Sequence, residues 1–332
     1  MKAQVLYATA PVQLAPLELI DRPLPELAPD AVLIAVRACG VCHTDLHVVE
    51  GELPSPLLPL VPGHEVVGVV EAVGERVTRF RVGERVGVTW LHDACGQCDF
   101  CKRGQENLCE AAHFTGYTAD GGYAEYMAVP EKFAVPIPER FSDVEAAPLL
   151  CAGVVGYRSV RLSGLQKGER LGIFGFGASG HIVIQLARHW GCEVYVFTRS
   201  PQHQQHARTL GAAWVGTAQE RPPHPLDRAI LFAPAGWLVP LALGHLSKGG
   251  TLAINAIHMS PIPEMPYGLL WHERTVRSVA NVTRQDAEEF LPLAAEIPIR
   301  TDTQVFDLEA ANRALQQVKA SMVNGAAVLR VR

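Results

Sequence analysis

Hydrophobic residues along the chain follow two different patterns. Up to about residue 150, short apolar runs such as residues 31–40 (AVLIAVRACG) and 65–74 (EVVGVVEAVG) are bounded by proline and glycine, which is typical of β-strands. From about residue 153 to 281, apolar strands alternate with helical stretches, as a parallel sheet with crossover helices requires. The pattern therefore predicts a β-rich part followed by an α/β part.

The pattern changes again after residue 281. Residues 283–296 (TRQDAEEFLPLAAE) begin with Thr283 and Asp286 in the spacing of a capping box, which marks the start of a helix. A further helix is expected near residues 307–322, and residues 326–332 should return to the first part as a strand. The expected core stripe of that helix comprises Ala311, Leu315, Val318 and Met322. We therefore expect a discontinuous first domain, residues 1–152 and 282–332, and a second domain, residues 153–281.

The composition indicates that the chain is globular. With 332 residues, of which 48% are hydrophobic and 19% charged, two domains are the natural expectation. A net charge of −5 without a basic stripe argues against a nucleic-acid partner. Prolines and glycines interrupt the most apolar stretch, residues 229–246, so we expect a strand, a turn and a core helix there and no membrane span. The first residues lack the pattern of a secretory signal, so a cytoplasmic location is expected.

Half of the eight cysteines lie in one loop, at Cys95, Cys98, Cys101 and Cys109. Disulfides are disfavoured in the cytosol, where such a cluster more often binds a metal. Glycines at positions 96 and 104 let the backbone turn back, so that four thiolates can surround a tetrahedral zinc ion and leave no open coordination position. A structural zinc is therefore favoured over free or disulfide-bonded thiols, and over an iron–sulfur cluster of the bacterial type, whose cysteine run ends in Cys-Pro.

Three other segments offer metal ligands. Cys42 lies in GVCHTDLH, His64 in PGHEVVG and Cys151 in LLCAGVVGY. Each alone has an ordinary explanation, since buried cysteine behaves as a small hydrophobic residue and a single histidine is usually a satisfied polar group. Together they supply two thiolates and an imidazole, a set that catalytic zinc sites use with a fourth position open for water or substrate.

In their order and spacing, these segments resemble the zinc-dependent medium-chain alcohol dehydrogenases over essentially the whole chain. The resemblance implies a catalytic domain with a GroES-like, partly open β-barrel, and a Rossmann domain with a doubly wound parallel sheet for a nicotinamide cofactor. It makes Cys42, His64 and Cys151 the catalytic zinc ligands. Glu65 would lie behind the metal as a transient ligand, and Asp45 would accept a hydrogen bond from His64.

The same resemblance implies roles in proton transfer and substrate binding. Thr44 would receive the proton of the alcohol, and His47 stands where relatives have the histidine that receives it through the cofactor ribose. A place on a surface loop explains His47 equally well when it is considered alone. Trp90 matches a position that often narrows the alcohol pocket, with a core aromatic as the alternative. Cys39 fits neither metal site and is assigned, like Cys192, to packing.

Residues 171–191 (LGIFGFGASGHIVIQLARHWG) predict an apolar strand, a tight turn and an amphipathic helix. Gly175, Gly177 and Gly180 form the pattern G-x-G-x-x-G in the context that a dinucleotide fold needs, with the pyrophosphate at the helix N-terminus. The resemblance adds His43, which matches a position near the cofactor pyrophosphate.

The end of the next strand should read the adenosine ribose. An acidic residue there would bind the 2′-hydroxyl of NAD, but the sequence has Thr198, Arg199 and Ser200. Arg199 can pair with a 2′-phosphate, which favours NADP(H) over NAD(H); the alternative is that it stacks on adenine or faces solvent, which leaves NAD acceptable. Against the resemblance, Ala326 replaces an arginine and Val155 a threonine, which suggests differently organised cofactor contacts.

Taken together, the sequence favours a zinc-dependent oxidoreductase with two zinc ions per chain. It would transfer hydride between a primary or simple secondary alcohol and a nicotinamide cofactor, giving an aldehyde or ketone. An NADPH-dependent aldehyde reductase of the cinnamyl-alcohol-dehydrogenase type is the alternative enzyme, and a non-catalytic zinc and dinucleotide binder is the alternative of another class. Besides a small-molecule substrate, the expected partner is another copy of the chain, as a dimer or tetramer.

Overall fold

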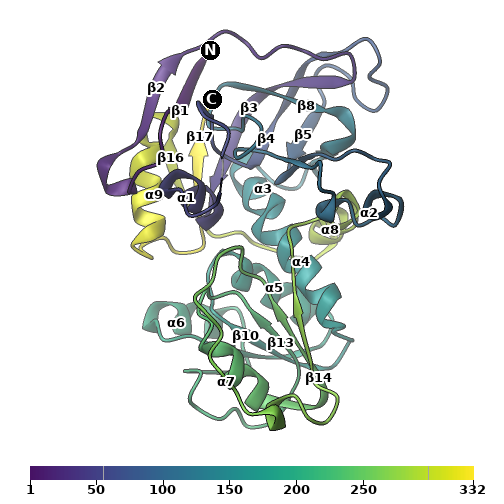
Figure 1. The fold of residues 1–332 in the computed structure, drawn as a ribbon, viewed down its shortest axis with the longest axis vertical. Helices are drawn as coiled ribbons and strands as arrows, with labels where there is room; N and C mark the ends of the chain where they lie inside the picture. Colours follow the sequence, from purple (N-terminus) through teal and green to yellow (C-terminus); the bar gives the residue numbers. More distant parts are fainter. Residues whose placement is uncertain (55, 298) are drawn as a thin grey trace. The chain divides into compact units, whose positions relative to one another are not determined.

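The chain divides into two compact units (Figure 1). The computed structural model describes residues 1–54, 56–297 and 299–332. Unit 1 comprises Met1–Val154, Asn281–Ala295 and Thr301–Arg332, whereas unit 2 comprises Val155–Ala280 and Glu296–Arg300. Unit 1 is rich in β-structure and unit 2 contains a parallel sheet with helices, which confirms the predicted fold class.

The main sheet of unit 1 joins strands that are far apart in the sequence. Its strands are β3 (Ala31–Val41), β4 (Glu65–Val73), β5 (Arg85–Val88), β8 (Tyr126–Pro130), β9 (Ala134–Pro136), β16 (Thr303–Asp307) and β17 (Ala326–Arg330). Along the sheet they follow the order β16-β17-β3-β4-β5-β9, and β8 pairs with β3. β3 is buried at nearly every position and pairs antiparallel with β17, β4 and β8, so it holds this sheet together.

Smaller elements complete unit 1. Two short sheets pair β1 (Lys2–Leu6) with β2 (Leu17–Asp21), and β6 (Leu91–Asp93) with β7 (His113–Phe114). The α-helices are α1 (His43–Glu50), α2 (Asp99–Lys102), α3 (Asp143–Ala146), α4 (Ala152–Ser163, which continues into unit 2), α8 (Arg284–Glu296) and α9 (Ala311–Lys319). Short 3-10 turns are η1 (Val12–Leu14), η2 (Glu106–Leu108), η3 (Glu131–Phe133), η4 (Ala147–Leu150) and η6 (Leu308–Ala310).

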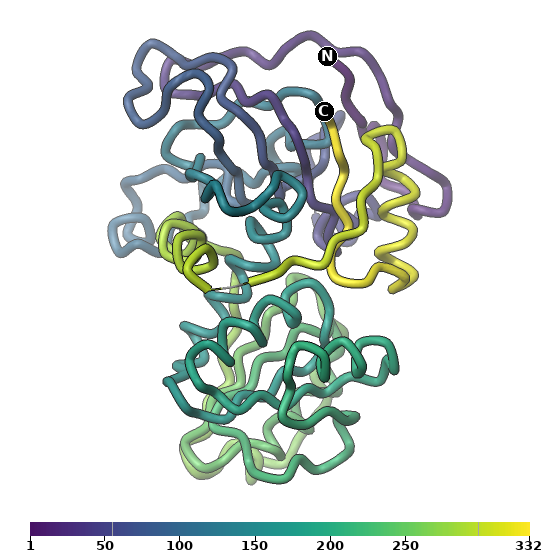
Figure 2. Tube along the Cα trace, turned by 180° about the vertical axis from the view of Figure 1, so that it is seen from behind, coloured from purple at the N-terminus to yellow at the C-terminus, as the bar shows by residue number. Residues whose placement is uncertain are grey.

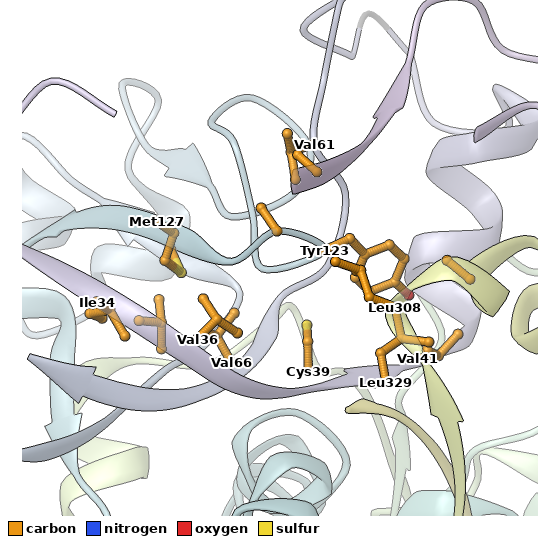
Figure 3. Packing of buried hydrophobic residues seen from close by; sticks show 14 of the residues in the cluster. Ile34, Val36, Cys39, Val41, Val61, Val66, Tyr123, Met127, Leu308 and Leu329 are labelled. Carbon is orange, nitrogen blue, oxygen red and sulfur yellow. The ribbon is translucent and has the colours of Figure 1, made fainter. Parts of the chain in front are cut away.

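The core of unit 1 is formed by side chains from these separated strands (Figure 3). Ile34 of β3, Val66 of β4, Met127 of β8 and Leu329 of β17 are all at most 2% exposed. Burial of one such side chain stabilises the fold by about 1.5–3 kcal/mol. Cys39 lies in the same cluster and is fully buried, as expected for a packing residue.

The last part of the chain returns to unit 1 largely as expected. The predicted capping box is confirmed, because the Asp286 carboxylate accepts hydrogen bonds from the Thr283 N–H and hydroxyl, and Thr283 Oγ1 accepts one from the Asp286 N–H. β17 lies between β3 and β16, which confirms the predicted return strand (Figure 2). The prediction that Met322 belongs to a core stripe is wrong. α9 ends at Lys319, Ser321 has a left-handed backbone (φ 55°), and the Met322 side chain is 68% exposed.

Unit 2 is built on a parallel sheet. Its strands, β10 (Arg170–Phe174), β11 (Glu193–Phe197), β12 (Trp214–Gly216), β13 (Leu226–Leu231), β14 (Leu246–Ile254) and β15 (Thr275–Ser278), follow the order β12-β11-β10-β13-β14-β15. All their pairings are parallel. The intervening helices are α5 (Ala178–His189), α6 (Pro201–Thr209) and α7 (Leu238–His245), with the short turn η5 (Tyr267–Leu269).

The apolar stretch 229–246 forms the end of β13, a turn and α7, as predicted from its prolines and glycines. Both elements contribute to the core of unit 2. Within the part of the chain that the structure describes, no helix has both the length and the apolarity that crossing a bilayer requires.

Candidate metal centres and cofactor turn

The four-cysteine loop brings its sulfur atoms together. The Sγ atoms of Cys95, Cys98, Cys101 and Cys109 all lie within 4.8 Å of one another. Gly96 and Gly104 hold left-handed backbone conformations (φ 71° and 69°), which allow the loop to reverse direction on each side of α2. The spacing of the four cysteines therefore brings together four thiols, none of them in a disulfide, at distances that suit a tetrahedral metal site.

Backbone N–H groups in this loop point at the sulfur atoms. The Cys98 N–H donates to Cys95 Sγ at 3.3 Å, and the Cys101 N–H donates to Cys98 Sγ at 3.5 Å. The N–H groups of Gln97 and Cys98 lower the pKa of the Cys95 thiol to about 6. Because the thiolate is the form that binds metal, these contacts favour the metal-binding form of Cys95.

An ion pair fastens the cysteine loop to α8. Glu106, in η2, accepts hydrogen bonds from the Arg284 N–H at 2.9 Å, from its Nε at 2.8 Å and from its terminal guanidinium nitrogen at 2.8 Å. The Arg284 guanidinium also lies 5.1 Å from the centre of the Phe133 ring. Burial acts to raise the pKa of Glu106, but Arg284 outweighs it and lowers that pKa. No sequence pattern indicated this pair.

A second cluster unites the three separated segments. One potential ligand atom from each of Cys42, His64, Glu65 and Cys151 lies within 4.8 Å of the others. Cys42 follows β3, His64 and Glu65 stand at the beginning of β4, and Cys151 follows η4. In the described residues, this group and the four-cysteine loop are the two clusters of such side chains that could hold a metal ion.

The sequence Cys-His-Thr-Asp folds locally as a helix cap. Cys42 is the N-cap of α1, and its Sγ accepts a hydrogen bond from the Thr44 N–H at 3.2 Å. In return, Asp45 Oδ2 accepts the Cys42 N–H at 2.9 Å, so that sulfur and carboxylate form a capping box. The cap fixes the position of the Cys42 sulfur before any metal binds.

Asp45 also orients His64. Its Oδ1 lies 2.7 Å from His64 Nδ1, while His64 Nε2 lies 3.3 Å from Cys42 Sγ. Both Asp45 and His64 are fully buried. A carboxylate at Nδ1 places the ring proton there and leaves Nε2 as the nitrogen for a metal.

The electrostatics of this buried cluster fit a site for a cation. The hydrogen bond from Cys151 and the nearby His64 outweigh burial and hold the pKa of Cys42 well below its usual range. Burial and the negative Cys42 sulfur raise the pKa of Glu65 well above its usual range. Burial acts to lower the pKa of His64, but Asp45 and Cys42 outweigh it and raise that pKa. Protons thus compete for the positions that a metal would occupy, and metal binding displaces them.

The glycine turn of unit 2 has the geometry expected for a dinucleotide fold. Gly175 follows β10 with φ 90°, and a Cβ there would lie 2.8 Å from the Ala233 nitrogen. Gly177 is the N-cap of α5, and a Cβ on Gly180 would lie 3.1 Å from the Gly175 carbonyl oxygen. No side chain caps the start of α5, and the N–H groups of a helix N-terminus suit a pyrophosphate.

Family models of known proteins match a segment in each of the two units. Residues 28–139 match the family model of the alcohol dehydrogenase GroES-like domain, and residues 178–296 that of the zinc-binding dehydrogenase domain. A probable alcohol dehydrogenase AdhA of Mycobacterium tuberculosis is 48% identical, with 99% of this chain and 97% of that protein covered. The chain belongs to the zinc-dependent medium-chain alcohol dehydrogenase family.

Solved structures of this family are also similar over their whole length. A cinnamyl alcohol dehydrogenase from Sorghum bicolor aligns with a TM-score of 0.91 at 29% identity, covering 99% of this chain and 97% of that one. A cinnamyl alcohol dehydrogenase from Helicobacter pylori, complexed with NADP(H), aligns with a TM-score of 0.88 at 25% identity, covering 99% of both chains. As a member of this family, the chain is a zinc- and nicotinamide-dependent alcohol oxidoreductase with small-molecule substrates.

The remaining predicted residues of this alcohol dehydrogenase lie as follows. Trp90 is buried, with its ring edge-to-face against His64 (centroids 4.9 Å apart) and stacked on Phe114 and Tyr117. Thr44 and the more exposed His43 are in the first turn of α1, and His47 is one turn further. Trp90 therefore adjoins the Cys42–His64 cluster and also belongs to an aromatic stack.

The end of β11 carries the residues predicted to read the ribose. Arg199 is exposed, and Ser200 caps α6 by accepting the His203 N–H at 3.3 Å. The Thr198 carbonyl accepts a hydrogen bond from Gln204 at 2.8 Å. These contacts give the segment a fixed backbone, from which the Arg199 side chain extends to the surface.

Sequence reasoning missed two residues that contact predicted site residues. Gly40, opposite Glu65 in the β3–β4 ladder, provides the space for the Glu65 carboxylate. Glu52, just after α1, is hydrogen-bonded to His47 Nδ1. A glycine within an apolar strand is a recognised signal of a close approach, whereas nothing in the sequence pairs Glu52 with His47.

Proposed function

We propose that Cys42, His64 and Cys151 hold a catalytic zinc, and that the chain interconverts primary or simple secondary alcohols with aldehydes or ketones. The observation that carries this proposal is the buried cluster itself, with its ligand atoms within 4.8 Å and Asp45 bound to the ring nitrogen of His64 remote from Cys42. Two thiolates and an imidazole leave a coordination position open, as catalytic zinc sites do.

The zinc would supply Lewis acidity, which lowers the pKa of a coordinated hydroxyl group. Residues of the chain would orient the ligands, transfer protons and contact the substrate. Asp45 keeps the His64 ring in one orientation, and Glu65 provides a further carboxylate behind the three ligands. The Thr44 hydroxyl would accept the proton of the alcohol while it releases its own, and His47 would take up the relayed proton and pass it to solvent. Trp90 forms an apolar wall beside His64, which favours the carbon chain of a substrate over water.

A second zinc would be held by Cys95, Cys98, Cys101 and Cys109, giving two ions per chain. Four thiolates fill a tetrahedral site, so this ion stabilises the loop and takes no part in the reaction. The hydrogen bonds between Glu106 and Arg284 then transmit that stability to α8.

The cofactor would be NADP(H) in preference to NAD(H). Support comes from the exposed Arg199 between Thr198 and Ser200, where no carboxylate repels a 2′-phosphate. A glycine turn at Gly175, Gly177 and Gly180 would receive the pyrophosphate, with His43 as a further contact. The similar Helicobacter pylori enzyme binds NADP(H), whereas another similar structure is an NAD-dependent alcohol dehydrogenase, so the ratio of rates with the two cofactors is the deciding measurement.

The second candidate is an aldehyde reductase of the cinnamyl-alcohol-dehydrogenase type. It is favoured by the likeness to the Sorghum bicolor enzyme and by the aromatic stack of Trp90, Phe114 and Tyr117 beside His64. Rates with aromatic and aliphatic aldehydes, each with NADPH and NADH, separate the two candidates.

We also propose a homo-oligomer, a dimer or tetramer, in the cytoplasm. All four residues of β15, the last strand in the order of the unit 2 sheet, are exposed, as are the large side chains of Tyr267 and Trp271. An exposed edge strand and exposed aromatic side chains both suit pairing with a second copy. Light scattering after size-exclusion chromatography tests this, and cell fractionation tests the location.

The experiment that tests the main proposal is a steady-state screen of alcohols with NADP and NAD, with zinc measured on the same sample. We expect turnover of at least one alcohol class and two zinc ions per chain. Zinc-replete protein that oxidises no alcohol of a broad panel would favour the non-catalytic binder instead.

A further inference from the structure

Cys151 lies at a bend between two helical elements. The 3-10 turn η4 ends at Leu150 and α4 begins at Ala152, while Cys151 has φ −124° and ψ −73°, outside the helical range. The backbone therefore changes direction at the cysteine itself. Because the backbone fixes the position of Cβ, this bend determines the direction in which Sγ leaves the chain, toward the cluster with Cys42 and His64.

Close packing encloses this bend on the α4 side. Gly153 lies in the first turn of α4, and its φ is not in the left-handed region, so its backbone does not require glycine. A Cβ on Gly153 would lie 2.5 Å from Phe290 Cε1, 3.0 Å from its Cζ and 3.4 Å from Leu149 Cδ2. Leu149 precedes Cys151 by two residues and Gly153 follows it by two, and Phe290 and Leu149 are both fully buried. The Phe290 ring thus lies against the backbone where the two sides of the bend meet.

Phe290 belongs to the buried face of α8. The side chains on this face recur three or four positions apart, as expected for an amphipathic helix, and each is at most 1% exposed. They comprise Asp286, Ala287, Phe290, Leu291 and Ala294. Because these neighbours are close-packed, the Phe290 ring has little freedom to shift unless the whole helix moves.

The start of α8 is attached to the four-cysteine loop. Glu106, which lies between Cys101 and Cys109 and is 5% exposed, binds both the backbone N–H and the guanidinium of Arg284. Phe290 follows Arg284 by six residues, about 9 Å along a helix. One short segment of α8 therefore contacts the cysteine loop at its start and the bend at its middle, and Figure 1 shows α8 beside α2 of that loop.

We propose that Phe290 is a positioning residue for Cys151. Its ring fixes the bend that presents the Cys151 sulfur to the zinc, and α8 connects that bend to the four-cysteine loop. The inference rests on the proposed function, because it takes Cys151 as a zinc ligand. It extends that function by a residue outside both metal clusters and outside the glycine turn.

The physical reason is the narrow tolerance of a metal site. A Zn–S bond is about 2.3 Å long, and the ligands have to be held to within about 0.5 Å. Since protein cores are close-packed, a smaller side chain at position 290 leaves a space into which the backbone of Gly153 can relax. Cys151 is two residues away, so its sulfur would less often have the geometry that zinc requires. A ring that only filled the core would affect stability without a preference for either metal.

The first experiment measures zinc release to a chromophoric chelator from the zinc-replete full chain and from Phe290→Leu. Cys42→Ser, which lacks a ligand of the proposed catalytic ion, identifies the release phase of that ion. We expect Phe290→Leu to accelerate this phase about tenfold, the lower end of the usual effect of a residue behind the ligands on metal affinity, and the release of the loop ion by less.

Phe306→Leu is the matched control for this experiment. Phe306 is 4% exposed in the core of unit 1, but it lies on β16, at one end of the main sheet. It should leave the catalytic phase unchanged. Identical catalytic phases in Phe290→Leu and the unaltered chain, or an equal acceleration in Phe306→Leu, would overturn the proposal.

An exchange of sizes separates the contact from a general loss of packing. Gly153→Ala alone places a methyl group against the Phe290 ring and should also accelerate release of the catalytic ion about tenfold. Combined with Phe290→Leu, the methyl group gains room, so the double variant should release this ion more slowly than either single variant. Thermal melting shows whether all variants are folded. Effects that simply multiply would mean that positions 153 and 290 act independently, which contradicts the proposal.

The connection to the cysteine loop is tested by a second cycle with Glu106→Gln. Weakening the bond to Arg284 should accelerate release of the catalytic ion about threefold in the unaltered chain, and not in Phe290→Leu, where the contact with the bend is already lost. An equal acceleration in both backgrounds would refute the connection through α8. None of these measurements depends on turnover. If the zinc-replete chain oxidises no alcohol, the proposed function fails, and the release rates still decide the role of Phe290.

Discussion

Gly40 limits the space available behind the proposed catalytic zinc site. It lies in β3 directly opposite Glu65, and its backbone does not require glycine, since its φ is not in the left-handed region. Space is the reason: a Cβ on Gly40 would lie 1.7 Å from Glu65 Oε2 and 2.6 Å from its Cδ. In Gly40→Ala the carboxylate must therefore move by about 2 Å to reach an ordinary contact of about 3.5 Å.

The consequences follow from the burial of Glu65, which is 2% exposed. Because the surrounding core is filled, we expect Gly40→Ala to lower the free energy of unfolding by about 1–3 kcal/mol, the usual cost of overpacking. The displaced carboxylate also leaves the cluster of Cys42, His64 and Cys151, so that the site should hold its zinc less tightly and turnover should fall.

Denaturant titration measures the first effect, and zinc content with the absorption spectrum of the cobalt-substituted protein measures the second. Gly268→Ala is the matched control, since a Cβ there would have no neighbour within 4 Å. Adding Glu65→Ala should recover part of the stability lost in Gly40→Ala, because it removes the two closest contacts. If Gly40→Ala kept the stability, zinc content and activity of the unaltered chain, the reasoning about this carboxylate would be wrong.

Further variants test the remaining assignments. Cys42→Ser should abolish turnover and leave the fold intact, as judged by circular dichroism; retained activity would refute its role as a ligand. Cys101→Ser should release one zinc ion and lower the melting temperature, and an unchanged melting curve would argue against a structural metal. Glu106→Gln should cost about 1–2 kcal/mol at neutral pH. Because the pKa of Glu106 is lowered in the folded chain, this stabilisation is present above the ordinary glutamate pKa and is lost as the pH falls through the folded value, so the two melting temperatures should converge below about pH 4. Arg199→Ala should raise KM for NADPH about tenfold and leave KM for NADH unchanged, since it removes a charge-assisted bond to a phosphate; equal effects on both cofactors would exclude a 2′-phosphate contact.

Much of the fold could be predicted from local patterns in the sequence. The capping box of Thr283 and Asp286 and the glycine turn after β10 involve neighbours a few residues apart, so composition and spacing reveal them. The close spacing of the four loop cysteines likewise implied the thiol cluster. For Cys42, His64 and Cys151, which are far apart in the chain, the family resemblance supplied the expectation that they meet.

Other features depend on contacts that no local sequence pattern predicts. Arg284 lies 178 positions from Glu106, and either residue alone reads as an ordinary surface charge. β16 (TQVFD) was not predicted, because Phe306 is its single buried residue and its other residues are polar or exposed. Met322 continued an apolar helical spacing, but the left-handed Ser321 ends that periodicity and directs the side chain outward.

Because β17 lies inside the main sheet of unit 1, that sheet can be completed only at the end of synthesis. β3, which leads into Cys42, forms early, yet its partner Ala326–Arg330 leaves the ribosome only after unit 2 has emerged. Until then one edge of β3 has unpaired backbone groups, a surface to which nascent chains adhere. We therefore expect ribosome-associated chaperones to increase the yield of this protein. Tags that delay release of β17 should increase aggregation while leaving unit 2 folded.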